Sequence, residues 1–282
     1  MECSQEPNHS TINLLLISDI HRKETLKRLI KRKEEILGTT SFDYILNCGD
    51  LTFVDHFYGQ KSDDLKYQIW LFHHVLSSLE SFEIPHIYIP GNHDPIETYS
   101  CSVPSVLAKI TELSTNLHNH CVKLADHLWL AGFGGSTPKL TEDGSLFGPG
   151  FPFKFEDMKQ EITELISLIP KHDQVILMTH SPPAHVGSCT IDQDGRAGMV
   201  FSLGSQSMYD QITSLMQDYD LFLVIHGHTH PEPGMNWIHR YGKNCCVVNP
   251  GGNGRGLYGK LRLQLINGSW KIVSCEHCCY YW

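Results

Sequence analysis

The sequence has no apolar run that approaches the ~20 residues needed to cross a membrane as a helix. Residues 1–13 are polar and lack the apolar stretch of a secretory signal, so we expect a cytoplasmic protein. A positive net charge is also lacking: the formal value is -9, which argues against broad, non-specific nucleic-acid binding. Hydrophobic residues make up 41% of the 282 residues, which favours a sizeable core over disorder.

The chain also lacks the cysteine pattern of a small disulfide framework. Its ten cysteines are scattered, and we expect most of them to be reduced thiols that pack as small hydrophobic side chains. One late cluster leaves a zinc or lipidation site open: Cys275, His277, Cys278 and Cys279. Because no second cysteine pair has the spacing of a zinc ribbon or finger, the favoured interpretation is a Cys-rich tail over residues 275–282.

Alternating strand and helix patterns in the first third of the chain predict a layered α/β fold. Residues 12–17 form a short continuous apolar run, typical of a strand that is buried on both faces. Apolar residues at helical spacing follow over residues 26–37, and a second such stripe covers residues 65–79. Residues 44–46 and 86–89 are the next predicted strands. This β-α-β-α-β order indicates helices packed against a sheet.

The rest of the chain repeats this alternation. Helices are predicted over residues 158–169 and 208–216, the second with Ser205 as N-cap. Further strands are predicted over residues 128–133, 175–178, 221–225, 246–248, 261–265 and 270–273. The last two flank Asn267-Gly268, a typical hairpin turn. No break resembles a linker, so we predict one domain over residues 12–274, preceded by a disordered or loosely attached N-terminus over residues 1–11.

Two long loops, residues 134–154 and 181–204, are rich in Gly and Pro. Loops of this length in a compact domain are usually functional. Both follow predicted strands on the side of the polar motifs, so we expect them to wall a site.

Short polar motifs stand at the ends of five predicted strands: Asp19-Ile20-His21, Gly49-Asp50, Gly91-Asn92-His93-Asp94, His180 and Gly227-His228-Thr229-His230. Because ligands of open α/β sheets bind at the carboxyl ends of strands, we expect these side chains to lie together. Carboxylate, imidazole and amide oxygen ligands suit Mn, Fe or Zn. Residues two apart, such as Asp19 and His21, can both point inward from an extended segment. The lone carboxylate of Asp50 can bridge two cations through its two oxygens.

Taken in order over residues 12–273, these motifs resemble those of the calcineurin-like metallophosphoesterases. The later segment Val248-Asn249-Pro250-Gly251 also resembles the compact, single-domain branch. The resemblance implies an α/β fold, a four-layer α/β/β/α sandwich with mixed sheets. It further implies two divalent metal ions (Mn, Fe or Zn, with Mg as an alternative) and hydrolysis of a phosphodiester or phosphomonoester, such as a nucleotide, by attack of a metal-bound hydroxide.

The resemblance assigns a role to each motif residue. Three side chains would hold the first metal ion: Asp19, His21 and His230. Three others would hold the second: Asn92, His180 and His228. Asp50 would bridge the two ions. His93 would act as a catalytic residue beside the leaving group, and Asp94 completes the catalytic motif as a partner of the ligands.

The sequence departs from two branches of the superfamily at Phe53, three residues after Asp50. Purple acid phosphatases have a metal-binding Tyr at this place, and Phe has no oxygen to offer. Serine/threonine protein phosphatases have an Asp there, which orients the catalytic His, so that branch is also disfavoured. Asp55 is a less favoured candidate for orienting His93.

Arg22 directly follows a predicted ligand and is the best candidate for contact with a substrate phosphate, ahead of Arg196 and Arg255. Lysines and arginines give residues 22–33 a basic character that would steer anions. Because Glu24, Glu34 and Glu35 dilute this charge, a solvated helix face is the favoured interpretation of the rest of the run.

Three functions remain open. The leading one is a phosphohydrolase that acts on a small phosphate ester. The second is a nuclease of the same superfamily, which is disfavoured because little of the chain is left for a DNA-capping domain. The third is a non-catalytic scaffold that retains the fold, and the complete ligand set argues against it. The sequence determines neither the substrate nor the oligomeric state.

Overall fold

The computed structural model describes residues 10–53, 62–98, 103–110, 112–136, 139–140, 146–147, 155–187, 191–194, 199–202 and 204–280. Much of the two loops expected to wall the site, residues 134–154 and 181–204, therefore lies outside the described residues. Among the described residues, no helix is both long and apolar enough to cross a membrane.

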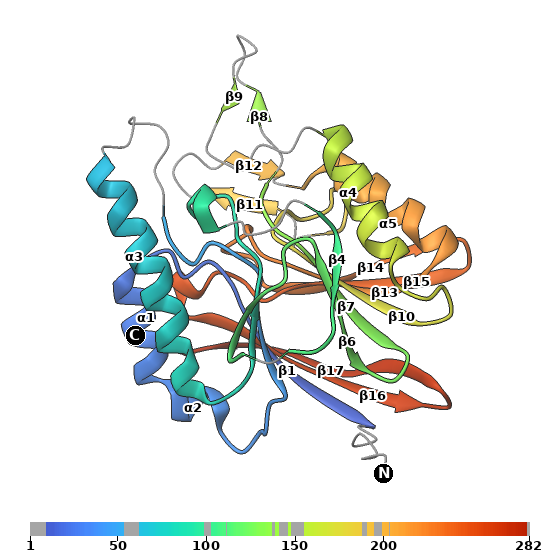
Figure 1. Ribbon diagram of the computed structural model, residues 1–282, viewed down its shortest axis with the longest axis horizontal. Coiled ribbons are helices and arrows are strands. Elements are labelled where there is room, and N and C mark those ends of the chain that lie inside the picture. Colours follow the sequence, from blue (N-terminus) through green and yellow to red (C-terminus); the bar gives the residue numbers. More distant parts are fainter. Residues whose placement is uncertain are drawn as a thin grey trace.

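Two large sheets form the centre of the molecule (Figure 1). The first has the order β17-β16-β1-β2-β3-β5, with β1 (Thr11–Ile17), β2 (Tyr44–Asn47), β3 (His86–Tyr88), β5 (Ser114–Asn116), β16 (Leu257–Ile266) and β17 (Ser269–Cys279). The second has the order β14-β15-β13-β10-β7-β6-β4, with β4 (Ser105–Leu107), β6 (His120–Ala125), β7 (Leu128–Phe133), β10 (Gln174–Thr179), β13 (Asp220–His226), β14 (Gly234–Arg240) and β15 (Lys243–Asn249). Both contain parallel and antiparallel pairs, so the prediction of mixed sheets is confirmed.

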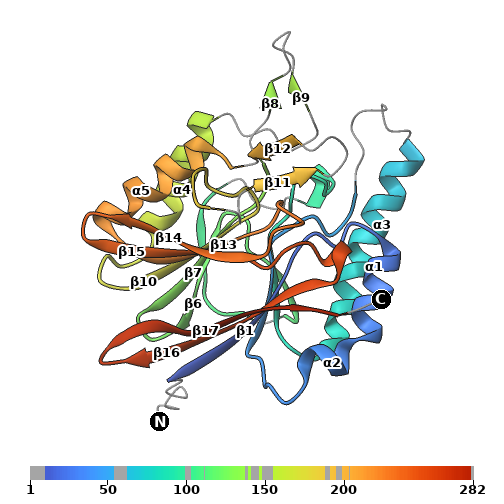
Figure 2. The same cartoon turned by 180° about the vertical axis from the view of Figure 1, so that it is seen from behind.

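Helices cover the outer face of each sheet (Figures 1 and 2). The first sheet carries α1 (Lys23–Lys31), α2 (Lys33–Leu37) and α3 (Ser62–Leu79), and the second carries α4 (Phe155–Ser167) and α5 (Gln206–Asp218). One apolar core fills the space between the sheets, and one lies under each helical layer. The four-layer α/β/β/α sandwich is therefore confirmed.

The apolar run of β1 shows why the sheets sit in the middle. Leu14 and Leu16 pack into the core between the sheets, whereas Leu15 and Ile17 pack under the helices. Side chains alternate between the faces of a strand, so a strand that is covered on both sides needs apolar residues at every position.

Several elements differ from the sequence prediction. The helix expected over residues 26–37 is broken at Arg32, whose ψ of 9° separates α1 from α2. Four strands of the main sheets were not predicted: β4, β5, β6 and β14. Of these, β5 is the polar tripeptide Ser-Thr-Asn, which has no alternation of apolar and polar residues and is a strand only through its pairing with β3. The N-cap role of Ser205 is confirmed, because its hydroxyl accepts the Met208 N–H at 3.2 Å.

Smaller elements complete the chain: 3-10 helices η1 (Glu80–Phe82), η2 (Ile96–Thr98) and η4 (Asn253–Arg255), and two-stranded sheets of β8 (Lys139–Leu140) with β9 (Leu146–Phe147) and β11 (Ile191–Asp194) with β12 (Met199–Ser202).

Residues 275–279, which we expected to belong to a Cys-rich tail over residues 275–282, form the end of a strand. β17 continues to Cys279, and it pairs with β16 through the expected Asn267-Gly268 turn, in which both φ angles are positive. Cys275 packs into the core between the sheets, whereas Cys278 packs under the helices. Because these two thiols lie on opposite faces of one sheet, they cannot share a zinc ion. The domain is also slightly longer than predicted, since β1 begins at Thr11.

A buried amide joins the two sheets at the end away from the polar motifs. Gln174, the first residue of β10, accepts the backbone N–H of Trp270 in β17 and donates to the Trp270 carbonyl at 3.3 Å. Both side chains are almost fully buried. The Trp270 indole N–H donates to the Asp126 carbonyl at 2.9 Å, so the linkage extends to the turn between β6 and β7.

We expect Gln174→Leu to lower the free energy of unfolding by about 1–3 kcal/mol, the usual cost of leaving buried backbone groups without hydrogen bonds. Urea unfolding followed by circular dichroism measures this change. Gln160→Leu is the matched control, because Gln160 is exposed on α4 and bonds only Glu164 among the contacts described. Equal stability losses in the two variants would contradict the cross-sheet role.

Candidate metal centre

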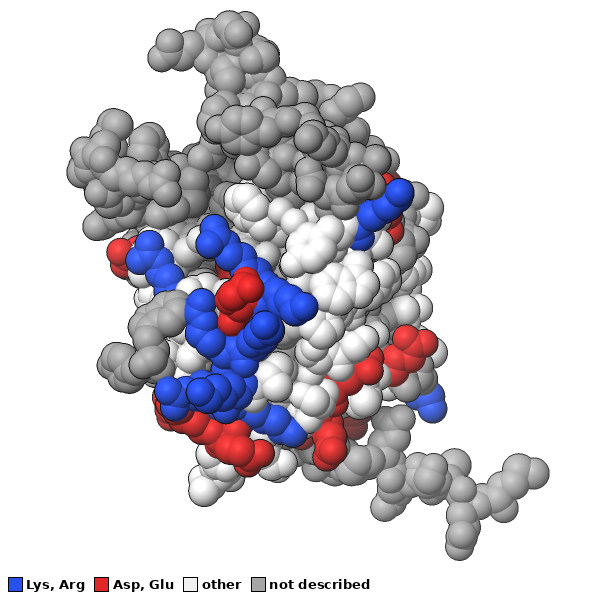
Figure 3. All heavy atoms as spheres, turned by 90° about the vertical axis from the view of Figure 1, so that its left-hand side faces the viewer, with Lys and Arg blue, Asp and Glu red and all other residues white. Residues whose placement is uncertain are grey.

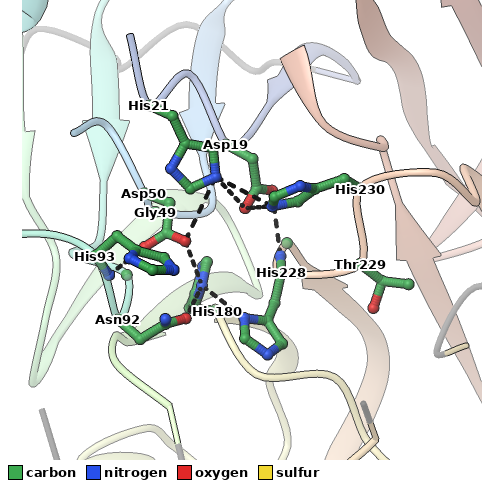
Figure 4. A network of polar contacts seen from close by, with 12 residues as sticks. Asp19, His21, Gly49, Asp50, Asn92, His93, His180, His228, Thr229 and His230 are labelled. Atoms are coloured by element: carbon green, nitrogen blue, oxygen red, sulfur yellow. Dashed lines mark hydrogen bonds and ion pairs between the residues drawn. The ribbon is translucent and has the colours of Figure 1, made fainter. Parts of the chain in front are cut away.

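The structure brings the polar motifs together where five strands end. β1, β2 and β3 are parallel neighbours in the first sheet, and β10 and β13 are parallel neighbours in the second. Their carboxyl ends meet at one edge of the sandwich. Figure 4 shows the imidazoles from both sheets turned toward the carboxylates of Asp19 and Asp50.

One group of four side chains has ligand atoms within 4.8 Å of one another: Asp19, His21, Asp50 and His230. His230 Nε2 lies 3.0 Å from Asp19 Oδ1 and 3.1 Å from His21 Nε2. His21 Nε2 lies 3.7 Å from Asp19 Oδ1 and 3.8 Å from Asp50 Oδ2. This is the first predicted ligand set together with the predicted bridge.

A second group, again with ligand atoms within 4.8 Å, contains Asp50, His180 and His228. His180 Nε2 lies 3.3 Å from Asp50 Oδ2 and 3.2 Å from His228 Nδ1. The side-chain oxygen of Asn92 lies 2.9 Å from His180 Nε2. The geometry thus places all members of the second predicted set together, and Asp50 is common to both groups.

Asp50 differs from the expected bridge in one respect. Its Oδ1 accepts the backbone N–H of His93 at 2.7 Å, whereas its Oδ2 faces His21 and His180. Oδ2 is therefore the Asp50 oxygen that faces both groups of imidazoles, and Asp50 would hold metal ions from this position.

The backbone at these residues is not extended, contrary to our expectation. Four predicted ligands have φ in the left-handed region: Asp19 at 57°, His21 at 57°, Asp50 at 55° and His228 at 68°. Such residues cost roughly 1–3 kcal/mol each and persist only where the surroundings impose them. Here the chain is fixed by backbone bonds from Asp19 N–H to the Gly49 carbonyl and from His21 N–H to the Asp50 carbonyl, both at 3.0 Å.

Two motif glycines allow the loops to approach this closely. A Cβ atom at Gly91 would lie 2.2 Å from Asp50 Oδ1, and one at Gly227 would lie 2.0 Å from the Ser18 hydroxyl. Any side chain at either place would push a neighbouring ligand loop away.

The atoms that face the centre suit cations. His21 Nδ1 lies 3.1 Å from the Thr52 carbonyl and His180 Nδ1 lies 2.7 Å from the Cys48 carbonyl, so both Nδ1 atoms are donors and both Nε2 lone pairs point inward. The buried atoms Asp19 Oδ1 and Asp50 Oδ2 accept no hydrogen bond. Buried carboxylate oxygens of this kind call for a positive partner.

The charges lead to the same conclusion. Burial opposes ionisation of Asp50, but the imidazoles of His180 and His93 hold its pKa well below the usual range. Burial lowers the pKa of His21 to about 4 and lowers that of His228 well below normal, which keeps both imidazoles neutral. Burial would also lower the pKa of His180, yet the carboxylates of Asp50 and Asp19 raise it to about 9. Without a metal ion, His180 is therefore the cationic partner of the two carboxylates, whereas His21 and His228 are neutral. The carboxylates thus attract positive charge into this centre, as a divalent cation would supply.

Asp94, which we expected to partner the ligands, is bound to the backbone. Its Oδ2 accepts N–H groups of Gly91 at 2.8 Å and Leu51 at 3.3 Å, and its Oδ1 accepts the Thr52 N–H at 2.9 Å. The buried carboxylate thus ties the loop after β3 to the loop after β2. This arrangement makes Asp94 a positioning residue.

The ring of His93 stacks on Phe53, with centroids 4.5 Å apart and an angle of 14° between the planes. Phe53, which argues against two branches of the superfamily, therefore packs against the predicted catalytic histidine. Asp55, the candidate for orienting His93, lies outside the described residues.

Sequence reasoning missed two supporting residues. Thr52 binds both Asp94 and the His21 ring. Asn249 donates to the carbonyls of Thr229 at 2.8 Å and Glu232 at 3.0 Å, which fixes the loop that carries the last two histidines. The Asn249-Pro250-Gly251 segment is part of the resemblance to the family, but only the structure shows that Asn249 holds the histidine loop in place.

The three arginines proposed to contact phosphate differ in their positions. Arg22 lines a pocket together with His21 and His230. Arg255 is exposed at the end of η4, and Arg196 lies outside the described residues.

Comparisons with known proteins bear on the fold and on the family of this chain. Among solved structures, TT1561 of Thermus thermophilus is 18% identical, with a TM-score of 0.55 over 93% of this chain and 98% of its own. A second crystal structure is 15% identical, with a TM-score of 0.62 over the same shares. The calcineurin-like phosphoesterase YfkN from Bacillus subtilis is 16% identical, with a TM-score of 0.44 over 95% of this chain and 90% of its own. No curated protein matches the chain significantly.

At these identities the first two structures support the fold alone. The sequence profile of the calcineurin-like phosphoesterases (Metallophos) matches residues 12–232, which is most of the chain and includes every predicted ligand. The chain therefore belongs to the calcineurin-like phosphoesterase family.

Proposed function

We propose that this protein is a dinuclear-metal-dependent phosphoesterase that hydrolyses a small phosphodiester or phosphomonoester. The observation that carries the proposal is the shared carboxylate: Asp50 Oδ2 is buried, accepts no hydrogen bond, and faces both groups of imidazoles. Cations on either side of this oxygen would supply positive charge to both groups of imidazoles at once, which the burial of the carboxylate favours.

The residues present fit two metal ions. One would be held by Asp19, His21, His230 and Asp50, and the other by Asp50, Asn92, His180 and His228. This mixed nitrogen and oxygen donor set suits Mn, Fe or Zn, with Mg as an alternative. When bound, two such ions activate water and neutralise the charge of a phosphoryl group.

The chain itself positions the proton donor. The backbone N–H of His93 is held by Asp50, and its carbonyl lies 3.2 Å from the Thr52 hydroxyl. Phe53 covers one face of its ring. A histidine fixed beside the ligands in this way would protonate the leaving oxygen, a contribution typically worth ~10²–10⁴ in rate.

All seven predicted ligands and His93 are present, which argues against a scaffold that has lost its chemistry. Hydrolysis of bis-p-nitrophenyl phosphate by metal-stripped protein after addition of Mn²⁺ would support the proposal. Absence of turnover with Mn²⁺, Fe²⁺, Zn²⁺ and Mg²⁺ on a panel of phosphate esters would favour a scaffold. Cleavage confined to single-stranded DNA would favour a nuclease.

We expect His93→Ala to retain both metal ions and to lower kcat by a factor of about 10²–10⁴, because the substitution removes a proton donor and no ligand. Steady-state kinetics and elemental analysis of the same preparation measure the two quantities. His239→Ala, an exposed histidine on β14, is the matched control and should keep full activity. Unchanged turnover in His93→Ala would remove the assigned role.

Asp50→Asn should lower metal content instead, because it replaces the buried charge that both groups share. Elemental analysis after dialysis is expected to show the loss of at least one of the two metal ions. Asp210→Asn removes the same charge from the exposed face of α5 and should leave both ions in place. Full metal content in Asp50→Asn would rule out the bridging position.

A further inference from the structure

A pocket of about 360 Å³ opens beside the first ligand group. This volume corresponds to roughly ten water molecules, which leaves room for a substantial part of a substrate. Six of the residues that line it matter here: His21, His230, Arg22, Arg28, Thr25 and Phe53. The pocket thus connects the metal centre with the first turns of α1.

The lining is cationic. Arg22 and Arg28 contribute two guanidinium groups, and none of the described residues that line the pocket is acidic. Figure 3 shows lysines and arginines gathered on this side of the molecule. This basic surface coincides with α1, which has four basic residues and one acidic residue, whereas the short helix α2 has one basic and two acidic residues.

Three other basic side chains of this surface make contacts outside the pocket. Arg32 pairs with Glu35 at 2.9 Å, Lys23 lies over the Trp70 ring, and Lys33 donates to the Ser81 carbonyl. None of these three lines the pocket, whereas Arg22 and Arg28 do. The general positive charge of α1 would attract anions, and these two arginines line the pocket where an anion would bind.

The pocket lies on the side of the centre where the leaving group is expected. Phe53 lines the pocket and also stacks on His93, the proposed proton donor. The His230 side chain is 38% exposed, while those of His180 and Asp50 are fully buried. The centre is therefore open toward the pocket, and a group leaving beside His93 would enter it.

We propose that Arg22 and Arg28 bind a second anionic group on the leaving part of the substrate. The substrate class is then phosphate esters whose leaving group carries a further phosphate or carboxylate. Guanidinium groups suit both anions, because their planar array of donors binds two oxygens at once. This proposal rests on the proposed function, which supplies the position of the reacting phosphoryl group.

The test compares three non-hydrolysable probes of equal chain length: propylphosphonate, 3-phosphonopropanoate and propane-1,3-bisphosphonate. Isothermal titration calorimetry on the manganese-loaded protein gives their dissociation constants, and inhibition of bis-p-nitrophenyl phosphate hydrolysis gives an independent measure. We expect the two probes that carry a second anionic group to have dissociation constants at least about tenfold lower than that of propylphosphonate, because they gain charge-assisted hydrogen bonds. The tighter of the two identifies carboxylate or phosphate as the preferred second group.

The variants Arg22→Ala and Arg28→Ala should each remove most of this advantage while keeping their manganese content. Lys27→Ala takes the same charge from an exposed position on α1 that does not line the pocket, and it should retain the advantage. Equal affinity of the wild-type protein for all three probes would overturn the proposal. So would an advantage that falls equally in all three variants, because general surface charge would then account for it.

Failure of this proposal is distinguishable from failure of the proposed function. Turnover of bis-p-nitrophenyl phosphate, combined with equal affinity for the three probes, would support the phosphoesterase function and contradict the anion subsite. Tighter binding of the probes with a second anionic group, without turnover of any ester, would support the subsite and contradict the catalytic function.

Discussion

Two carboxylates buried among imidazoles, those of Asp19 and Asp50, are the constraint on which the rest of the centre depends. An ionised carboxylate without a partner is too costly to keep in the interior. Here hydrogen bonds satisfy Asp50 Oδ1 but leave Oδ2 and Asp19 Oδ1 without donors. The surrounding structure holds these atoms toward imidazole nitrogens, an arrangement that becomes favourable when cations occupy the space between them.

That arrangement requires loops from both sheets to approach more closely than ordinary side chains allow. The glycines of the motifs lack the Cβ atoms that would collide, and four predicted ligands have left-handed backbone angles. Asp94 and Asn249 then hold the loops in place through backbone hydrogen bonds. Fixing the ligand geometry thus lowers stability locally, while the large cores on either side and linkages such as Gln174 with Trp270 supply the compensating rigidity.

The centre is also asymmetric, which bears on its chemistry. His180 and Asp50 are sealed in the interior, whereas His230 is partly exposed beside a pocket with two arginines. Phe53 links the two sides, since it touches both the pocket and His93. In the function that we propose, a substrate would place its reacting phosphate deep in the centre and its leaving group toward α1.

Local patterns were enough to predict the candidate ligands, their order, and most of the alternation of strands and helices, because strand ends and helical periods are visible in short stretches of sequence. It also identified the family through those motifs. Only the tertiary structure showed that Asp50 offers one free oxygen, that Asp94 clamps loops, and that residues 275–279 are part of a strand. Short polar strands such as β5 likewise escaped prediction. The reason is physical: each of these features is decided by a neighbour distant in sequence, through pairing or backbone hydrogen bonds that no local pattern encodes.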